Sequence, residues 1–150
     1  MSIFAELTAG RATRSAEETR YFAQRFAEAL PPDATLALHG NLGVGKTTFV
    51  QGLAKGFGVT DAVTSPTFNI FTLHRGGTRT LVHLDAYRLE NDRQIESLML
   101  EDFLTSPYCL AVEWPEKIAA WLPANTFHVI LSIVDEHQHH LQLRPNTSRA

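Results

Sequence analysis

The chain has little cysteine and no long apolar run, and each shortage excludes a class of protein. Its single cysteine, Cys109, rules out an intramolecular disulfide framework, and its place in the apolar run YCLAVEW predicts a buried, inert thiol. No apolar stretch approaches the roughly 20 residues that a membrane-spanning helix needs. Residues 1–10 lack the basic start and apolar core of a signal peptide. We therefore expect a cytoplasmic protein without membrane contact.

Excess positive charge is also absent. The 13 Lys and Arg residues are outnumbered by 16 Asp and Glu residues, for a net charge of -3. Because phosphate neutralisation needs clustered Lys and Arg, contact with tRNA or any other nucleic acid would have to come from a local patch or a partner. The stretch HQHH, with His137, His139 and His140, has no cysteine or second ligand pair beside it, which favours a solvated hairpin over a metal site.

The composition is that of an ordinary globular domain. With 150 residues, 44% of them hydrophobic, the chain can bury a sizeable core, and we expect one domain over residues 1–150. Hydrophobic periodicity predicts helices at residues 16–30, 46–55, 91–104 and 115–122. It predicts strands at residues 35–40, 66–74, 78–88, 108–114, 126–134 and 139–144.

Local signals support several of these boundaries. Ser15 and Glu18 form a capping box at the start of the first helix, and Pro31 stops it. Gly56 and Gly58 follow the second helix. Residues 75–77, Arg-Gly-Gly, join two strand-like runs as a hairpin would, so antiparallel pairing enters the sheet.

The most informative segment is LALHGNLGVGKTTFV, residues 36–50. Residues 40–47 match G-x-x-x-x-G-K-[ST], a pattern that about one chain of this length in two hundred matches by chance. The glycines permit unusual dihedrals and let backbone amides approach phosphate oxygens, and the following helix adds its positive N-terminus. The segment predicts a phosphate loop in an α/β fold, P-loop NTPase-like, with three layers (α/β/α) and a mixed central sheet.

This loop supplies the predicted ATP-binding residues. Lys46 is expected to reach the β- and γ-phosphates, and the hydroxyl of Thr47 to ligate Mg²⁺. The predicted nucleotide contacts of the loop and the first helical turn are Asn41, Leu42, Gly43, Val44, Gly45, Lys46, Thr47 and Thr48.

Two carboxylates stand at the ends of predicted strands. Asp85 ends the strand in LVHLDAYRLE, and Glu113 ends the strand in LAVEWPE. Beside a phosphate loop, such acids can orient the metal and the attacking water, so we predict both as catalytic and metal-associated residues. A third segment, residues 64–67 (Thr64, Ser65, Pro66 and Thr67), can order around a γ-phosphate as switch loops do, although the segment by itself favours a turn that contains a proline.

The order GNLGVGKTTF, TSPTF, HLDAYRL, LEDFL and EWPE resembles the bacterial TsaE family of tRNA threonylcarbamoyladenosine biosynthesis proteins, also called YjeE, over most of the chain. The resemblance implies a small ATPase that assists the TsaB–TsaD pair in threonylcarbamoyl transfer to tRNA and resets it between turnovers. It implies that Trp114 neighbours the nucleotide, that Asp85 and Glu113 have the roles given above, and that residues 64–67 are switch-like. It leaves tRNA contact by this chain uncertain.

Two positions depart from the family pattern. Asn41 stands where the family usually has aspartate, which removes a negative charge near the phosphates. Met99 stands where the family tends to have glycine, and we expect only a local change of helix geometry.

Two other functions remain open from the sequence. A small-molecule kinase would need an acceptor pocket and an arginine-rich lid, and neither is evident. A nucleotide-gated binding module would share its residues with the ATPase, so the sequence does not separate the two.

Overall fold

The computed structural model describes residues 2–41, 45–60, 62–64, 70–75 and 77–144. The elements in chain order are α1 (Ile3–Ala9), β1 (Arg11–Thr13), α2 (Ala16–Ala29), β2 (Ala34–His39), α3 (Lys46–Gly56), β3 (Phe71–His74), β4 (Thr80–Asp85), α4 (Asp92–Ser97), η1 (Leu100–Phe103), β5 (Tyr108–Glu113), η2 (Pro115–Ile118), β6 (Phe127–Asp135) and β7 (Gln138–Arg144).

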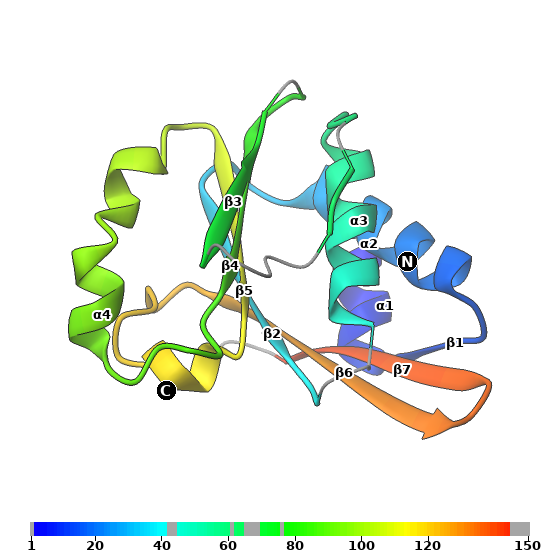
Figure 1. The fold of residues 1–150 in the computed structure, drawn as a ribbon. Coiled ribbons are helices and arrows are strands. Elements are labelled where there is room, and N and C mark those ends of the chain that lie inside the picture. Colours follow the sequence, from blue (N-terminus) through cyan, green and yellow to red (C-terminus); the bar gives the residue numbers. More distant parts are fainter. Residues whose placement is uncertain (1, 42–44, 61, 65–69, 76, 145–150) are drawn as a thin grey trace.

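The strands form a mixed sheet in the order β1-β7-β6-β2-β5-β4-β3. Strand β2 runs parallel to β5 and β6, and β4 runs parallel to β5. The pairs β3–β4, β6–β7 and β1–β7 are antiparallel. Helices α1, α2 and α3 cover one face, and α4 with the short η1 and η2 helices covers the other (Figure 1). The predicted three-layer fold with a mixed sheet is confirmed, as is the hairpin between β3 and β4.

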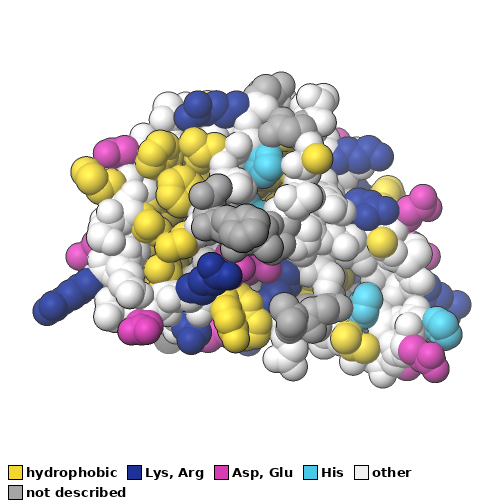
Figure 2. Space-filling view, viewed as in Figure 1, with side chains coloured by type: hydrophobic (Ala, Val, Ile, Leu, Met, Phe, Trp, Pro, Cys, Tyr) yellow, Lys and Arg dark blue, Asp and Glu magenta, His cyan; other side chains and the backbone are white. Residues whose placement is uncertain are grey.

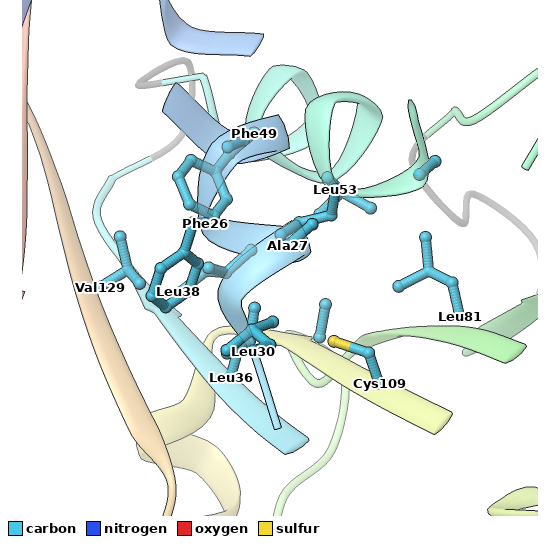
Figure 3. Packing of buried hydrophobic residues seen from close by; sticks show 14 of the residues in the cluster. Phe26, Ala27, Leu30, Leu36, Leu38, Phe49, Leu53, Leu81, Cys109 and Val129 are labelled. Atoms are coloured by element: carbon cyan, nitrogen blue, oxygen red, sulfur yellow. The ribbon is translucent and has the colours of Figure 1, made fainter. Parts of the chain in front are cut away.

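The core on the α1–α3 face is built around aromatic rings. Phe26 of α2 is fully buried, and its ring lies 5.4 Å from that of Phe4 and 6.0 Å from that of Phe127 between centroids. Figure 3 shows Phe26 beside Phe49 of α3 and Leu38 of β2. Cys109 lies in the same core with no exposed surface, and burial raises the pKa of its thiol to about 12, which confirms the predicted inert cysteine.

Helix α2 begins as the sequence predicts. The hydroxyl of Ser15 accepts a hydrogen bond from the backbone N–H of Glu18 at 3.1 Å, and the Glu18 carboxylate accepts one from the N–H of Arg14 at 2.9 Å. These bonds satisfy N–H groups that have no partner inside the helix.

Helix α3 packs tightly against α2 at two glycines. A Cβ at Gly52 would lie 2.5 Å from the carbonyl oxygen of Arg20, and one at Gly56 would lie 2.6 Å from the Cβ of Ala27. Gly56 is therefore the last residue of α3 and takes part in this contact, whereas the sequence predicts that it follows the helix. Gly58 makes the left-handed turn beyond the helix, with φ 79°. This close packing fixes the helix that carries Lys46.

The predicted helix over residues 91–104 is wrong in one respect. It is broken at Met99, which has a left-handed backbone (φ 52°, ψ 42°), into α4 and the 3₁₀ turn η1. The break lets Ile95 and Leu100 both reach full burial in the core on this face. The predicted helix over residues 115–122 is likewise shorter, a 3₁₀ turn over Pro115–Ile118, and the predicted strand over residues 66–74 is described only as Phe71–His74.

The stretch HQHH forms the turn between β6 and β7 and the start of β7, as predicted. Among the described residues, no group of three or more His, Cys, Asp or Glu side chains could hold a metal ion. None of the helices in the described ranges has the length and apolar character needed to cross a membrane.

Candidate functional site

The carboxyl ends of three parallel strands meet beside the start of α3. In the sheet register, Leu38 of β2 lies opposite Glu113 of β5, and Asp85 of β4 lies opposite the same Glu113. Strand β2 ends one residue before Gly40, and the chain returns at Gly45 to begin α3. Such convergence at the carboxyl edge of parallel strands is where α/β folds bind ligands.

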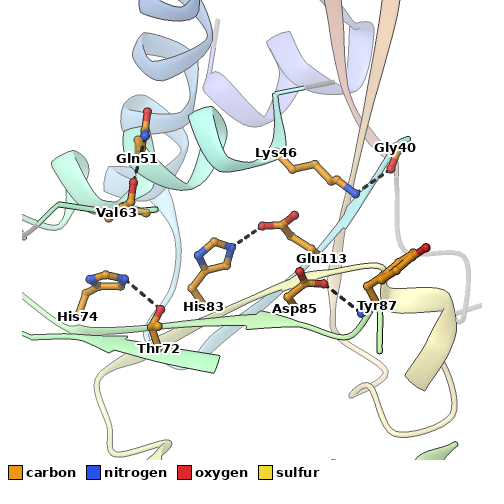
Figure 4. A network of polar contacts seen from close by, with 10 residues as sticks. All are labelled: Gly40, Lys46, Gln51, Val63, Thr72, His74, His83, Asp85, Tyr87 and Glu113. Carbon is orange, nitrogen blue, oxygen red and sulfur yellow. Dashed lines mark hydrogen bonds and ion pairs between the residues drawn. The ribbon is translucent and has the colours of Figure 1, made fainter. Parts of the chain in front are cut away.

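Strand alternation aims the acidic side chains at α3. Successive strand residues point to opposite faces, and Leu81 and Ala111 belong to the core under α1–α3. Asp85 follows Leu81 by four residues and Glu113 follows Ala111 by two, so both lie on the face that carries Lys46. The sequence prediction that the two carboxylates lie near each other and beside the loop lysine is therefore correct (Figure 4).

Lys46 is held in the centre of this arrangement. Its side chain is only 5% exposed, and Nζ donates to the carbonyl of Gly40 at 2.9 Å. The same Nζ lies 4.0 Å from the ring centroid of Trp114, within cation–π range. Burial lowers the pKa of Lys46, and the charges of Glu113 and Asp85 oppose that shift. The result is a desolvated ammonium group facing two carboxylates.

The helix that carries Lys46 begins without a side-chain cap. Gly45 has a left-handed backbone (φ 95°, ψ 25°) and caps α3, and within the described ranges no side chain accepts from the first amides. A Cβ at Gly45 would meet nothing within 4 Å, so glycine is favoured here by the dihedral and not by lack of space. Uncapped amides and the helix dipole together favour an anion at this end.

Glu113 is paired with a residue that sequence reasoning missed. The Nε2 atom of His83 lies 2.6 Å from Oε2 of Glu113, and the exposed fractions are 0% for His83 and 5% for Glu113. Figure 4 shows the two side chains pointing toward each other across β4 and β5. The spacing His83-x-Asp85 was the available signal, because it places both side chains on one face of a strand.

Backbone hydrogen bonds fix the two strand ends to each other. The N–H of Ala86 donates to the carbonyl of Glu113 at 3.0 Å, joining β4 to β5 at the site. Asp85 uses Oδ1 to accept from the N–H of Tyr87 at 3.0 Å, as a short polar residue does at the start of a turn. Neither carboxylate-bearing residue therefore sits on a free loop.

An aromatic pair forms one rim of the site. The rings of Tyr87 and Trp114 lie 5.1 Å apart between centroids, and Lys117 Nζ lies 5.8 Å from the Tyr87 ring centroid. Trp114 has a left-handed backbone (φ 57°) and is half-buried against the α4-side core. Tyr87 is 57% exposed. Trp114 therefore packs against the α4-side core and contacts Lys46, while the exposed ring of this rim is Tyr87.

A pocket of about 170 Å³ adjoins the other side of the α3 start. Thr48, half-buried like Thr47, contributes to it from the first turn of α3. The pocket also draws on α2 and on the β6–β7 turn, and its lining is Arg14, Ser15, Ala16, Thr19, Gly45, Thr48, Glu136, His137 and His139. Sequence reasoning did not find this pocket, because only the tertiary fold brings its three segments together.

Several predicted positions are not tested by the site geometry. Asn41 and Thr64 are exposed. Leu42, Gly43 and Val44 of the predicted loop lie outside the described residues, as do Ser65, Pro66 and Thr67 of the predicted switch-like segment. The switch hypothesis therefore stays a prediction.

The fold and the Lys46 site define a phosphate-loop α/β protein. The chain belongs to the TsaE family, which is involved in tRNA threonylcarbamoyladenosine biosynthesis: the family model "Threonylcarbamoyl adenosine biosynthesis protein TsaE" matches residues 13–142. The resemblance seen in the motifs is thereby confirmed.

Individual relatives agree with the family. The chain is 37% identical over 119 residues to the "tRNA threonylcarbamoyladenosine biosynthesis protein TsaE" of Bacillus subtilis, covering 79% of this chain and 74% of that protein. It is 39% identical over 123 residues to the protein of that name from Rickettsia bellii, covering 81% and 85%. A crystal structure of Bacillus subtilis YdiB superposes with a TM-score of 0.77 at 30% identity, covering 93% of this chain and 86% of that one.

Proposed function

We propose that this protein binds Mg²⁺–ATP at the Lys46 site and hydrolyses it slowly, as the ATPase that assists a TsaB–TsaD pair in modifying tRNA and resets that pair between turnovers. The observation that carries the proposal is the buried Lys46 ammonium group at an uncapped helix start, facing two carboxylates at strand ends. Since the modified molecule is tRNA, the proposal includes a cytoplasmic location. The proposal does not include direct contact between tRNA and this chain.

The phosphate end of the nucleotide is assigned to α3. Lys46 would exchange its bond to the Gly40 carbonyl for a charge-assisted bond to a phosphate oxygen, and the first amides of α3 would donate to others. A desolvated ammonium binds a phosphate more strongly than a hydrated one, because the opposing charges interact through less water.

The oxygen donors at the site fit Mg²⁺. This small, hard cation takes one or two protein carboxylates or hydroxyls and completes its shell with water and phosphate oxygens, which agrees with a site that has no cage of its own. The hydroxyl of Thr47 and the carboxylates of Asp85 and Glu113 are the residues that would hold it. When bound, Mg²⁺ supplies neutralisation of phosphate charge during hydrolysis.

The nucleoside end is assigned to the pocket beside Thr48. A phosphate group held at the start of α3 leaves the rest of the nucleotide to extend across Gly45 and Thr48, both of which line that pocket. Arg14 and the half-buried ring of His139 offer a planar cation and an aromatic face to a purine. The proposal thereby gives the base a location, which the sequence alone did not suggest.

The rim formed by Tyr87 and Trp114 is the surface proposed for TsaB–TsaD. Tyrosine and tryptophan are enriched among the residues that anchor interfaces, and this rim touches the nucleotide-site lysine through the Trp114 ring. A partner bound here would sense whether Lys46 holds a phosphate.

Phosphate release tests the proposal. We expect Asp85→Asn and Glu113→Gln to lower Mg²⁺–ATP hydrolysis by about 10- to 100-fold with TsaB–TsaD present, while ATP affinity falls much less. Glu96→Gln is the matched control, since Glu96 is exposed on α4 and its charge is not among those acting on Lys46, and it should hydrolyse ATP normally. Normal hydrolysis by both site variants would make the strand-end acids structural. Tighter TsaB–TsaD binding with ATP but no phosphate release from wild type would establish a nucleotide-gated binding module in place of an ATPase.

A further inference from the structure

Core packing does not explain the buried histidine of β4. His83 has no exposed surface, and among the described residues its Nδ1 atom has no hydrogen-bond partner. A polar ring at such a position destabilises the fold unless its hydrogen bonds offset the lost hydration, and an aliphatic residue would avoid that cost. The bond to Glu113 is therefore the feature that distinguishes His83 from its apolar neighbours.

The sheet register directs His83 to Glu113. In the register of β4 and β5, His83 lies opposite Ala111. Two residues further along the strands, on the same face of the sheet, Asp85 lies opposite Glu113. The small Ala111 side chain leaves room for the imidazole ring to lean diagonally along the sheet, a direction in which long side chains on neighbouring strands can touch. The ring thus reaches the Glu113 carboxylate from the core side, opposite to the direction from which a ligand would enter.

The hydrogen bond between His83 and Glu113 occupies only one of the two carboxylate oxygens of Glu113. Oε2 of Glu113 is the atom bonded to His83, and Oε1 makes no hydrogen bond within the described part of the chain. A carboxylate oxygen accepts hydrogen bonds, so Nε2 of His83 is assigned as the donor in this contact, while Nδ1 has no partner among the described residues.

We propose that His83 is a positioning residue: its Nε2–H group holds Oε2 of Glu113 so that Oε1 alone is presented to the metal and water at the nucleotide site. This inference rests on the ATPase function proposed above. Outer hydrogen bonds of this kind fix the orientation of a ligating carboxylate, and their loss typically costs 10- to 100-fold in metal affinity or activity, so a magnitude of about that size is expected here.

Metal affinity in two His83 variants tests the proposal. We expect His83→Leu to weaken Mn²⁺ binding to the complex with a non-hydrolysable ATP analogue by about 10- to 100-fold, measured by electron paramagnetic resonance. Analogue affinity without metal, measured by titration calorimetry in EDTA, should stay as in wild type. His83→Gln should recover most of the Mn²⁺ affinity, because its amide N–H can occupy the position of Nε2.

His74→Leu is the matched control. His74 is also a buried histidine, 6% exposed, on the neighbouring strand β3, and it contacts Thr72 instead of a site carboxylate. The Mn²⁺ affinity of the His74→Leu variant should equal that of wild type. Wild-type Mn²⁺ affinity in His83→Leu, or a defect in His83→Gln as large as in His83→Leu, would overturn the role of the hydrogen bond.

The tautomer of His83 can be measured in the wild-type protein, so this test does not depend on whether a variant folds. Nitrogen-15 long-range correlation spectra of the metal-free protein should show the Nε2–H tautomer, and an Nδ1–H tautomer would overturn the proposal.

The proposed ATPase function and the proposed role of His83 can fail separately. Failure of wild type to bind metal with nucleotide would remove the proposed function and the role of His83 with it, whereas wild-type binding that is insensitive to His83→Leu would remove only the latter.

Discussion

The two faces of the central sheet are packed in different ways. On the face under α1–α3, regular helices meet through Gly52 and Gly56 and enclose the fully buried Phe26. On the α4 face the covering elements are short, and Met99 and Trp114 adopt left-handed backbones. Figure 2 shows hydrophobic side chains at the surface between β3 and the α4 segment, where several residues of this core are only partly buried.

The site takes different parts from each face. Lys46, His83 and Glu113 lie on the closely packed face, and the aromatic rim of Tyr87 and Trp114 lies on the irregular one. A site that must hold a carboxylate and an ammonium group in fixed geometry benefits from a rigid support. A surface that must respond to a bound phosphate benefits from elements of lower local stability. The comparison predicts that equal substitutions on the two faces have unequal effects.

The largest difference is expected for phenylalanine truncation. Phe26→Ala should lower the free energy of unfolding by about 3 to 5 kcal/mol, because it leaves a cavity among three other aromatic rings. Phe103→Ala is the counterpart on the other face, where the half-buried ring contacts Phe71, and it should cost less than half as much. Urea denaturation followed by circular dichroism measures both. Equal losses would mean that the two cores are equally well packed.

A smaller effect is expected at the contact of α2 with α3. In Gly52→Ala the new Cβ would meet the Arg20 carbonyl oxygen, and the strain should cost about 1 to 3 kcal/mol despite the better helix propensity of alanine. Because α3 carries Lys46, ATP affinity should fall as well. Lys55→Ala, on the exposed side of the same helix, should change neither quantity. Unchanged stability in Gly52→Ala would contradict the tight contact.

The smallest effect, and one of opposite sign, is expected on the irregular face. Met99→Gly should raise the free energy of unfolding by about 1 kcal/mol, because glycine adopts the left-handed backbone without the cost that a Cβ imposes. Met99 is 61% exposed, so little apolar contact is lost. Met99→Ala retains the Cβ and should not stabilise the protein. Stabilisation by alanine equal to that by glycine would show that backbone strain is not the cause.

These contrasts also explain what could be predicted from the sequence. The start of α3 after Gly45, the capping box at Ser15 and the placement of Asp85 and Glu113 follow from local patterns, because caps, glycines and strand alternation act within a few residues. The breaks at Met99 and Trp114 could not be predicted, because neither residue type favours a left-handed backbone and only the packing of distant segments imposes it.

The parts of the site that were missed depend on contacts between strands. The role of His83 depends on the register of β4 against β5, which the separate strand patterns do not specify. The pocket beside Thr48 combines Arg14 with His137, which are far apart in the chain. The short elements α1 and β1 carry too few residues for periodicity to reveal them.

The central claim is that Lys46 is the phosphate-binding cation, and titration calorimetry with Mg²⁺–ATP tests it most directly. Lys46→Ala should abolish measurable binding, because the helix amides alone cannot balance the phosphate charge. Lys55→Ala, which removes an exposed lysine from the last turn of the same helix, should bind as wild type does. Wild-type affinity in Lys46→Ala would contradict the account.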